Sequence, residues 1–295
     1  MKENSLSSPS NPQFDPQSPG GPAPIQLDIQ AQPYAAGVPA ISPAPGRPPV
    51  ENPAWNGWDV VLITVLAFFT ILVFQFAILM GAHYLRYPRT PLGVLAQKPI
   101  LLLVSQFLID GAVALYLILL VEGKYHVQFW PAIRWNWPSA AWKLLLLGAV
   151  MLLGLGVLER YLPMPQETPF EKLFARPLDA YLISIIAVSL GPLVEELFFR
   201  GFLYPVLARR WGIAWGVFLS ALPFAALHLP QYGWAWGAML VILIVGIVCG
   251  LVRAVTKSVG ASFLVHVGYN GSQMMIALVA THGFRHLEKA VLFLH

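Results

Sequence analysis

Long apolar runs dominate the chain from Trp55 onward and limit what it can fold into. A helix needs about 20 apolar residues to cross the hydrocarbon core of a bilayer. Runs of this kind, separated by short polar connections, occupy residues 58–82, 99–121, 141–158, 180–207, 213–229, 234–252 and 259–281. Open strands leave unpaired backbone groups in lipid, so these spans must be helical. The pattern predicts an all-α polytopic membrane protein with about seven transmembrane helices.

The composition supports the same conclusion. Hydrophobic residues make up 57% of the 295 residues and charged residues only 11%, whereas soluble domains are about one quarter charged. Much of the Lys and Arg lies in connections between the runs, which is typical of topology signals and not of nucleic-acid binding. The single cysteine, Cys249, allows no intrachain disulfide. We therefore expect an integral membrane protein that contacts lipid and does not bind nucleic acid. We place it in a bacterial plasma membrane.

The chain divides into five predicted segments. Residues 1–53 contain 13 of the 26 prolines. Such a segment buries too little apolar surface to offset its ordering entropy, so it is predicted to be a disordered tail. The other four segments are the first transmembrane helices at 54–160, an interfacial segment at 161–179, a transmembrane core at 180–282 and a C-terminal tail at 283–295.

Polar side chains are rare in the last four runs, and ionisable groups within spans usually face a cavity or a partner. They are Glu195, Glu196, Arg200, His228 and His266, with Asn270 as a polar companion. Glu196 and Arg200 are four residues apart and are expected to form an ion pair on one helix face. Glu195 is rotated from Glu196 by about 100° and must find its partners elsewhere.

Three of the runs bring polar groups to a similar depth. Counted from the basic end of each run, Glu195, His228 and Asn270 lie about 21, 24 and 20 Å along straight helices. His266 precedes Asn270 by one helical turn. Because scattered structural residues would have no reason to agree in depth, we expect these side chains to form one cluster.

Such a cluster suits the hydrolysis of an amide. A carboxylate in an apolar setting can act as general base toward a water that a neighbouring histidine shares. A second histidine and an asparagine can donate hydrogen bonds to the developing oxyanion. A carboxylate with two histidines also suits zinc, with water in the open position. No serine or cysteine completes a nucleophilic triad, and the residues alone leave both water-based alternatives open.

At these residues the sequence resembles the CPBP family of intramembrane proteases, which includes type II CAAX prenyl endopeptidases and bacteriocin-processing relatives. The resemblance covers residues 180–281. Its three motifs occur in the expected order: Glu195-Glu196-Leu197-Phe198-Phe199-Arg200, then Phe224 four residues before His228, then His266 four residues before Asn270, with Ser262 four residues further back.

The resemblance implies a role for each matched residue. Glu195 would activate water with help from His228, and His266 and Asn270 would line the oxyanion site. Three residues would support them: Glu196, Arg200 and Phe224. If a divalent metal such as zinc is bound, Glu195, His228 and His266 would hold it, although the glutamate-and-water mechanism needs none. The implied substrate is a membrane-associated protein or a prenylated peptide.

A rival hypothesis is a transporter or scaffold that uses the same polar cluster for binding. A transporter is disfavoured because the two halves of the chain show no repeat, and an inactive scaffold is disfavoured because all three motifs are complete. One polar residue of the earlier runs, Asp110 in "FLIDGAVALY", stands alone. It is interpreted either as a hydrogen bonder between packed helices or as a residue on the substrate path.

Overall fold

The computed structural model describes residues 51–165, 167–174 and 176–286. The chain divides into two units, residues 1–47 and 48–295, and all described residues lie in the second. The tail predicted at 1–53 therefore lies outside the described residues except for 51–53, and so does most of the predicted C-terminal tail, residues 287–295.

The described residues form helices joined by turns and loops, with no strand among them. In chain order these are α1 (Gly57–Leu85), α2 (Leu92–Leu95), α3 (Pro99–Ile118), the π-helical η1 (Leu119–Lys124), α4 (Phe129–Ala132), α5 (Ala141–Glu159), the 3-10 helix η2 (Glu171–Leu173), α6 (Pro177–Val188), α7 (Leu190–Glu196), the π-helical η3 (Leu197–Leu203), α8 (Tyr204–Trp211), α9 (Ile213–His228), the 3-10 helix η4 (Leu229–Tyr232), α10 (Trp236–Thr256) and α11 (Val259–Ala280).

Seven helical stretches in this part of the chain are long and apolar enough to cross a membrane. They are Gly57–Leu85, Pro99–Lys124, Ala141–Glu159, Pro177–Trp211, Ile213–Tyr232, Trp236–Thr256 and Val259–Ala280. Each contains one of the predicted apolar runs, apart from at most two residues at one end of the run. The predicted all-α membrane architecture with seven spans is confirmed, because continuous hydropathy over such lengths leaves the chain few other ways to satisfy its backbone in lipid.

The fourth span is 35 residues long, more than one straight crossing requires, and it is interrupted twice. Ser189 breaks the helix with φ −121° and ψ −80°, and Pro192 then lies in the first turn of α7, where its missing N–H costs nothing. After Glu196 the chain continues as the π-helical segment η3. Such segments are frequent at functional sites because they change which side chains share a face.

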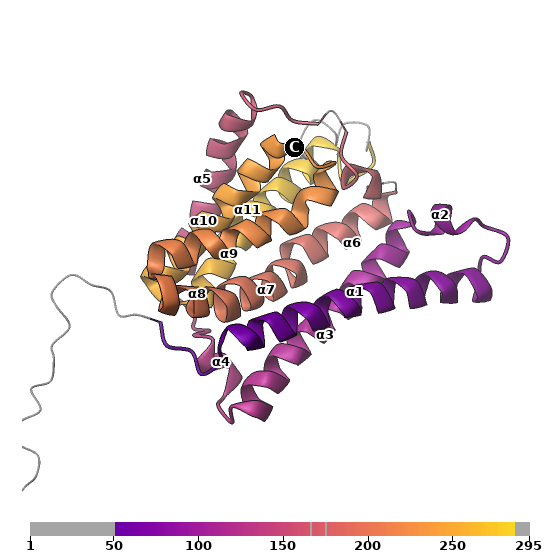
Figure 1. Ribbon diagram of the computed structural model, residues 1–295. Helices are drawn as coiled ribbons and strands as arrows, with labels where there is room; N and C mark the ends of the chain where they lie inside the picture. Colours follow the sequence, from indigo (N-terminus) through magenta and orange to yellow (C-terminus); the bar gives the residue numbers. More distant parts are fainter. Residues whose placement is uncertain (1–50, 166, 175, 287–295) are drawn as a thin grey trace, which may run out of the picture. The chain divides into compact units, whose positions relative to one another are not determined.

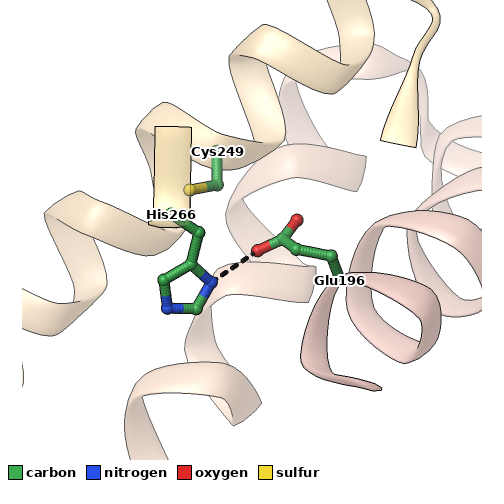
Figure 2. Close-up of side chains that lie close together, drawn as sticks. All are labelled: Glu196, Cys249 and His266. Carbon is green, nitrogen blue, oxygen red and sulfur yellow. Dashed lines mark hydrogen bonds and ion pairs between the residues drawn. The ribbon is translucent and has the colours of Figure 1, made fainter. Parts of the chain in front are cut away.

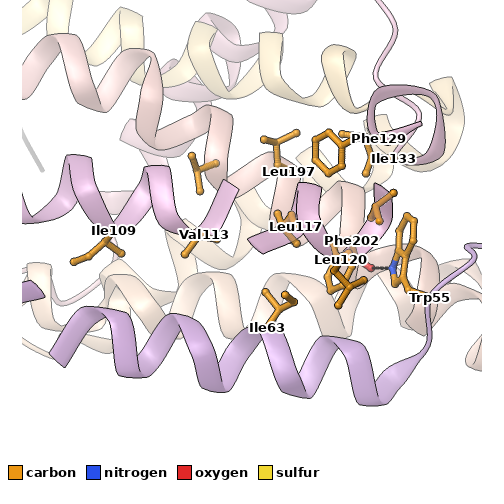
Figure 3. Packing of buried hydrophobic residues seen from close by; sticks show 12 residues of the cluster. Trp55, Ile63, Ile109, Val113, Leu117, Leu120, Phe129, Ile133, Leu197 and Phe202 are labelled. Atoms are coloured by element: carbon orange, nitrogen blue, oxygen red, sulfur yellow. Dashed lines mark hydrogen bonds between the residues drawn. The ribbon is translucent and has the colours of Figure 1, made fainter. Parts of the chain in front are cut away.

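The first two spans pack together through a cluster of buried apolar residues (Figure 3). Ile63 of α1 and Leu117 of α3 belong to this cluster, and so does Phe202 of η3. Trp55, just before α1, stacks on Phe202 with ring centroids 5.1 Å apart and donates its indole N–H to the Phe202 carbonyl at 2.9 Å. The cluster thus fixes α1 and α3 against the fourth span.

On the other side, α5 packs closely against α11, while α1 and α3 lie away from it (Figure 1). Gly148 and Gly268 allow this approach, because a Cβ at either position would collide with backbone atoms of the facing helix. Helices α6, α7 and α10 also contact α11. The π-helical segment η3 contacts it as well, so α11, which carries His266 and Asn270, is held on several sides.

Candidate active site

A cavity of about 260 Å³ lies between the helices and is lined mostly by apolar side chains. Its walls come from α3, α6, α7, α9, η4, α10 and α11, together with the last residue of α5 and the segment that joins α5 to α6. It contains five of the residues singled out from the sequence: Glu195, Phe224, His228, His266 and Asn270. A largely apolar cavity with a few convergent polar groups is the usual form of a binding or active site.

Each polar group reaches the cavity from a different structural context. Glu195 lies in the last turn of α7, just before the π-helical segment. His228 is the last residue of α9, which ends where Pro230 cannot continue the α-helical hydrogen bonding. His266 lies in the middle of α11, with Asn270 one turn further along.

The carboxylate of Glu195 lies between the two histidines. Its Oε1 is 3.6 Å from Nε2 of His228, and its Oε2 is 3.6 Å from Nε2 of His266. Both distances exceed a direct hydrogen bond, so the gaps suit a bridging water or ion. The side chain of Glu195 is 31% exposed and that of His266 only 3%, so the carboxylate faces the cavity while this ring forms its wall.

The tautomer of His228 follows from its backbone contact. Nδ1 lies 2.8 Å from the carbonyl oxygen of Phe224, which only accepts hydrogen bonds. Nδ1 therefore carries the hydrogen, and in the neutral ring Nε2 presents a lone pair toward Glu195. The Phe224 ring also packs against both histidines, with centroids 4.8 Å from His228 and 5.7 Å from His266.

Glu196 forms a buried polar network behind the cavity. Its Oε1 lies 3.0 Å from Nη1 of Arg200, the ion pair that the spacing predicts, and 3.0 Å from Nδ1 of His266 (Figure 2). The Ser262 hydroxyl donates to its other oxygen at 2.6 Å. Arg200 in turn donates to the Gly246 carbonyl at 2.9 Å. The charged groups of this ion pair therefore compensate each other although both side chains are fully buried.

The contact between Glu196 and His266 was missed in the sequence, where all the interhelical partners were assigned to Glu195. This contact holds the ring of His266 through Nδ1, so that the opposite nitrogen, Nε2, is directed at Glu195. The available signal was Ser262, one turn before His266. Residues four apart share a helix face, so Ser262 adds a second polar group to the side of α11 that carries His266.

Cys249 lies beside Glu196 and His266, and ligand atoms of the three residues come within 4.8 Å of one another (Figure 2). This group could hold a metal by its donor atoms. It suits a catalytic metal less well, because all three side chains are buried, whereas a catalytic metal needs a position that water and substrate can reach. The guanidinium of Arg200 at 3.0 Å from Glu196 also opposes a second cation there.

Asn270 is oriented by the fourth span. Its Nδ2 donates to the Ala187 carbonyl at 2.8 Å, and one N–H and the amide oxygen remain for the cavity. Ser220, one turn before Phe224, takes no part in the cluster, because its hydroxyl donates to the Val217 carbonyl within α9. The geometry thus brings Glu195, His228 and His266 together around one point and places Asn270 on the wall beside them.

Residues 177–272 match the family model described as type II CAAX prenyl endopeptidase Rce1-like. The matched segment runs from the start of α6 into α11 and contains every motif residue from Glu195 to Asn270. The resemblance recognised from the three motifs is confirmed over this segment. No curated protein and no solved structure matches the chain.

Proposed function

We propose that this chain is an intramembrane endopeptidase that hydrolyses a peptide bond with a water activated by Glu195 and His228. The observation that carries the proposal is the convergence of Glu195 with Nε2 of His228 and of His266, at 3.6 Å each, on the wall of one apolar cavity. These three groups come from three separate spans, and the segment that contains them matches a protease family.

The proposed chemistry begins with a water between Glu195 and His228. The carboxylate of Glu195 takes one proton from this water, and the oxygen of the water attacks the carbonyl carbon of the scissile peptide bond. The C–N bond then breaks, and Glu195 returns the proton to the leaving nitrogen. His228 accepts a hydrogen bond from the water through Nε2, because its Nδ1–H is committed to the Phe224 carbonyl.

The oxyanion of the tetrahedral intermediate is assigned to His266 and Asn270. Asn270 keeps one N–H after its bond to Ala187 and can donate it. His266 donates its Nδ1–H to Glu196, so its Nε2 can donate as well only when the ring holds a second proton. The buried carboxylate of Glu196 stabilises that form of the ring, which is the supporting role we assign to it.

The same donor set also fits a divalent metal. Both Nδ1 atoms contact oxygen acceptors, so both Nε2 atoms can act as ligands together with Glu195. The carboxylate of Glu196 behind His266 is the arrangement that orients a metal-bound histidine. Zinc held by Glu195, His228 and His266 would supply Lewis acidity and a more acidic water. The metal-assisted variant thus uses the same residues as the water mechanism.

We assign a membrane-associated protein or a prenylated peptide as substrate, since the cavity is mostly apolar and lies within the membrane-spanning helices. We place the protein in a bacterial plasma membrane, and fractionation of the source cells tests that placement.

The activity test compares the purified wild-type protein with its Glu195→Ala and His228→Ala variants. Each is assayed on a fluorogenic farnesylated peptide, and the products are identified by mass spectrometry. Both variants are expected to lose cleavage of the peptide, and full activity in both would contradict the proposed mechanism.

A further inference from the structure

A buried carboxyl group on α3 has only one of its two oxygens satisfied. Asp110 is 6% exposed, and its Oδ1 accepts a hydrogen bond from Nε2 of Gln106 at 2.7 Å. Its Oδ2 is buried and has no hydrogen-bond partner among the residues that the structure describes. An incompletely paired carboxyl within a membrane span is costly, so it calls for a role in function or packing.

Packing does not account for this pair. The hydrogen bond joins two residues of the same helix, four positions apart, so it does not hold α3 against a neighbour. Tyr116 on the same helix shows the contrast, because its hydroxyl lies 2.9 Å from the Thr70 hydroxyl of α1 and does join two spans. Of the two interpretations that the sequence left open for Asp110, the substrate path is favoured.

Gln106 connects the buried carboxyl to the active-site cavity. Its side chain lines the same cavity as Glu195, on the wall that α3 supplies. Helix α3 packs against α7, which carries Glu195. Gln106 is therefore a polar group at the cavity wall, and Asp110 holds it there.

The free atoms of Gln106 match a peptide backbone. A carboxamide has two N–H donors and one oxygen acceptor, and one N–H is committed to Asp110. The remaining N–H and Oε1 lie on one plane, as do the carbonyl and N–H of a peptide group. Because the Asp110 oxygen accepts from Nε2, the carboxamide is fixed in the orientation that leaves Oε1 free.

We propose that Gln106 binds the substrate by hydrogen bonds to a main-chain amide next to the scissile bond, and that Asp110 is the positioning residue that orients it. This inference rests on the proposed endopeptidase function, because it requires a peptide in the cavity. It adds a sequence-independent contact from α3 to a site whose four motif residues, Glu195, His228, His266 and Asn270, all come from the matched segment.

Binding of a dye-labelled farnesylated peptide tests the inference apart from catalysis. The measurement uses purified Glu195→Ala protein, which keeps the peptide intact. Adding Gln106→Leu or Asp110→Leu is expected to raise Kd about tenfold, the effect of losing one or two hydrogen bonds. Asp110→Asn keeps an oxygen for Gln106 and is expected to restore Kd to within about twofold of the parent. Tyr116→Phe, which removes the bond to α1, is the control and should leave Kd unchanged.

A set of peptides in which each backbone amide in turn is replaced by an ester locates the contact. One ester is expected to weaken binding in the parent but not in the Gln106→Leu variant. An unchanged Kd in Gln106→Leu, or no binding of any peptide, overturns the inference. Peptide that binds through Gln106 but is never cleaved by wild-type protein contradicts the proposed function alone. Thermal unfolding of each variant shows that the fold is intact, and Gln106→Leu carries the test if Asp110→Leu fails to fold.

Discussion

Nδ1 of His266 lies 3.0 Å from Oε1 of Glu196, and this contact joins α11 to α7. The opposite ring nitrogen faces the neighbouring residue, Glu195. Two adjacent glutamates therefore act on opposite nitrogens of one histidine. In the proposed mechanism Glu196 supports the site and Glu195 carries the chemistry, so substitutions of the two residues are expected to have different effects.

Loss of Glu196 is expected to destabilise the fold. Glu196→Ala would leave Arg200 as a buried charge without its counter-ion, at a cost of about 3–5 kcal/mol in the free energy of unfolding. The measurement is thermal or denaturant unfolding of the purified protein in detergent. Glu167→Ala is the matched control, because its ion pair with Lys172 spans 3.9 Å between two exposed side chains and should contribute less than about 1 kcal/mol. Equal stability of both variants would contradict the assignment.

The residues just before α1 are expected to stabilise the bundle. Oε1 of Glu51 lies 3.1 Å from Nη1 of Arg134 and 3.1 Å from Nη1 of Arg253, whose side chain is only 1% exposed. Deletion of residues 2–54 would leave Arg253 buried and unpaired, so the unfolding temperature should fall.

Deletion of residues 2–50 is the matched control for this prediction. It keeps Glu51 and should leave the unfolding temperature unchanged, because it removes only the part of the chain predicted to be a disordered tail. An equal loss of stability in both deletions would contradict the role of Glu51.

The close contact between α5 and α11 is expected to tolerate no added side chain. A Cβ at Gly268 would collide with the backbone of Leu145, so Gly268→Ala should cost about 1–3 kcal/mol of stability through overpacking. Gly271→Ala on the same helix is the control, because its Cβ would meet Cγ1 of Val188 at an ordinary 3.5 Å. Unfolding of the two variants in detergent compares them, and a fully stable Gly268→Ala protein would show that the helices can separate at little cost.

The spans and the convergence of the candidate site residues could be predicted from the sequence for physical reasons that are local. Hydropathy over about 20 residues defines each span, and the depth of Glu195, His228 and His266 follows from counting residues along helices. The contact between Glu196 and His266 could not be predicted in this way. It depends on how α7 is rotated against α11, which the break at Ser189 and the π-helical segment determine.

The contacts of Glu51 also could not be predicted from the neighbouring residues in the sequence. The Pro-rich composition of residues 1–53 indicates a tail with little apolar surface, and that interpretation extended to Glu51. Its partners Arg134 and Arg253 lie 83 and 202 residues further along the chain. Only the packed helices bring these two arginines to one place, so no short stretch of sequence reveals the contact.

Removal of metal distinguishes the two forms of the proposed chemistry. The water mechanism needs no metal, so cleavage of the farnesylated peptide is expected to persist after chelation, and elemental analysis of the purified protein is expected to find no stoichiometric zinc. Loss of cleavage on chelation, with recovery on adding zinc, would show that Glu195, His228 and His266 hold a metal instead.

Glu195→Gln tests the central claim most directly, because it keeps the size of the side chain and removes only the carboxylate. The measurement is kcat for cleavage of the farnesylated peptide, with unfolding temperature as the check on folding. The account predicts a fall in kcat of at least about a hundredfold in a fully folded protein. Glu159→Gln changes another carboxylate on the same cavity and should retain activity. Wild-type cleavage by a folded Glu195→Gln protein would contradict the account.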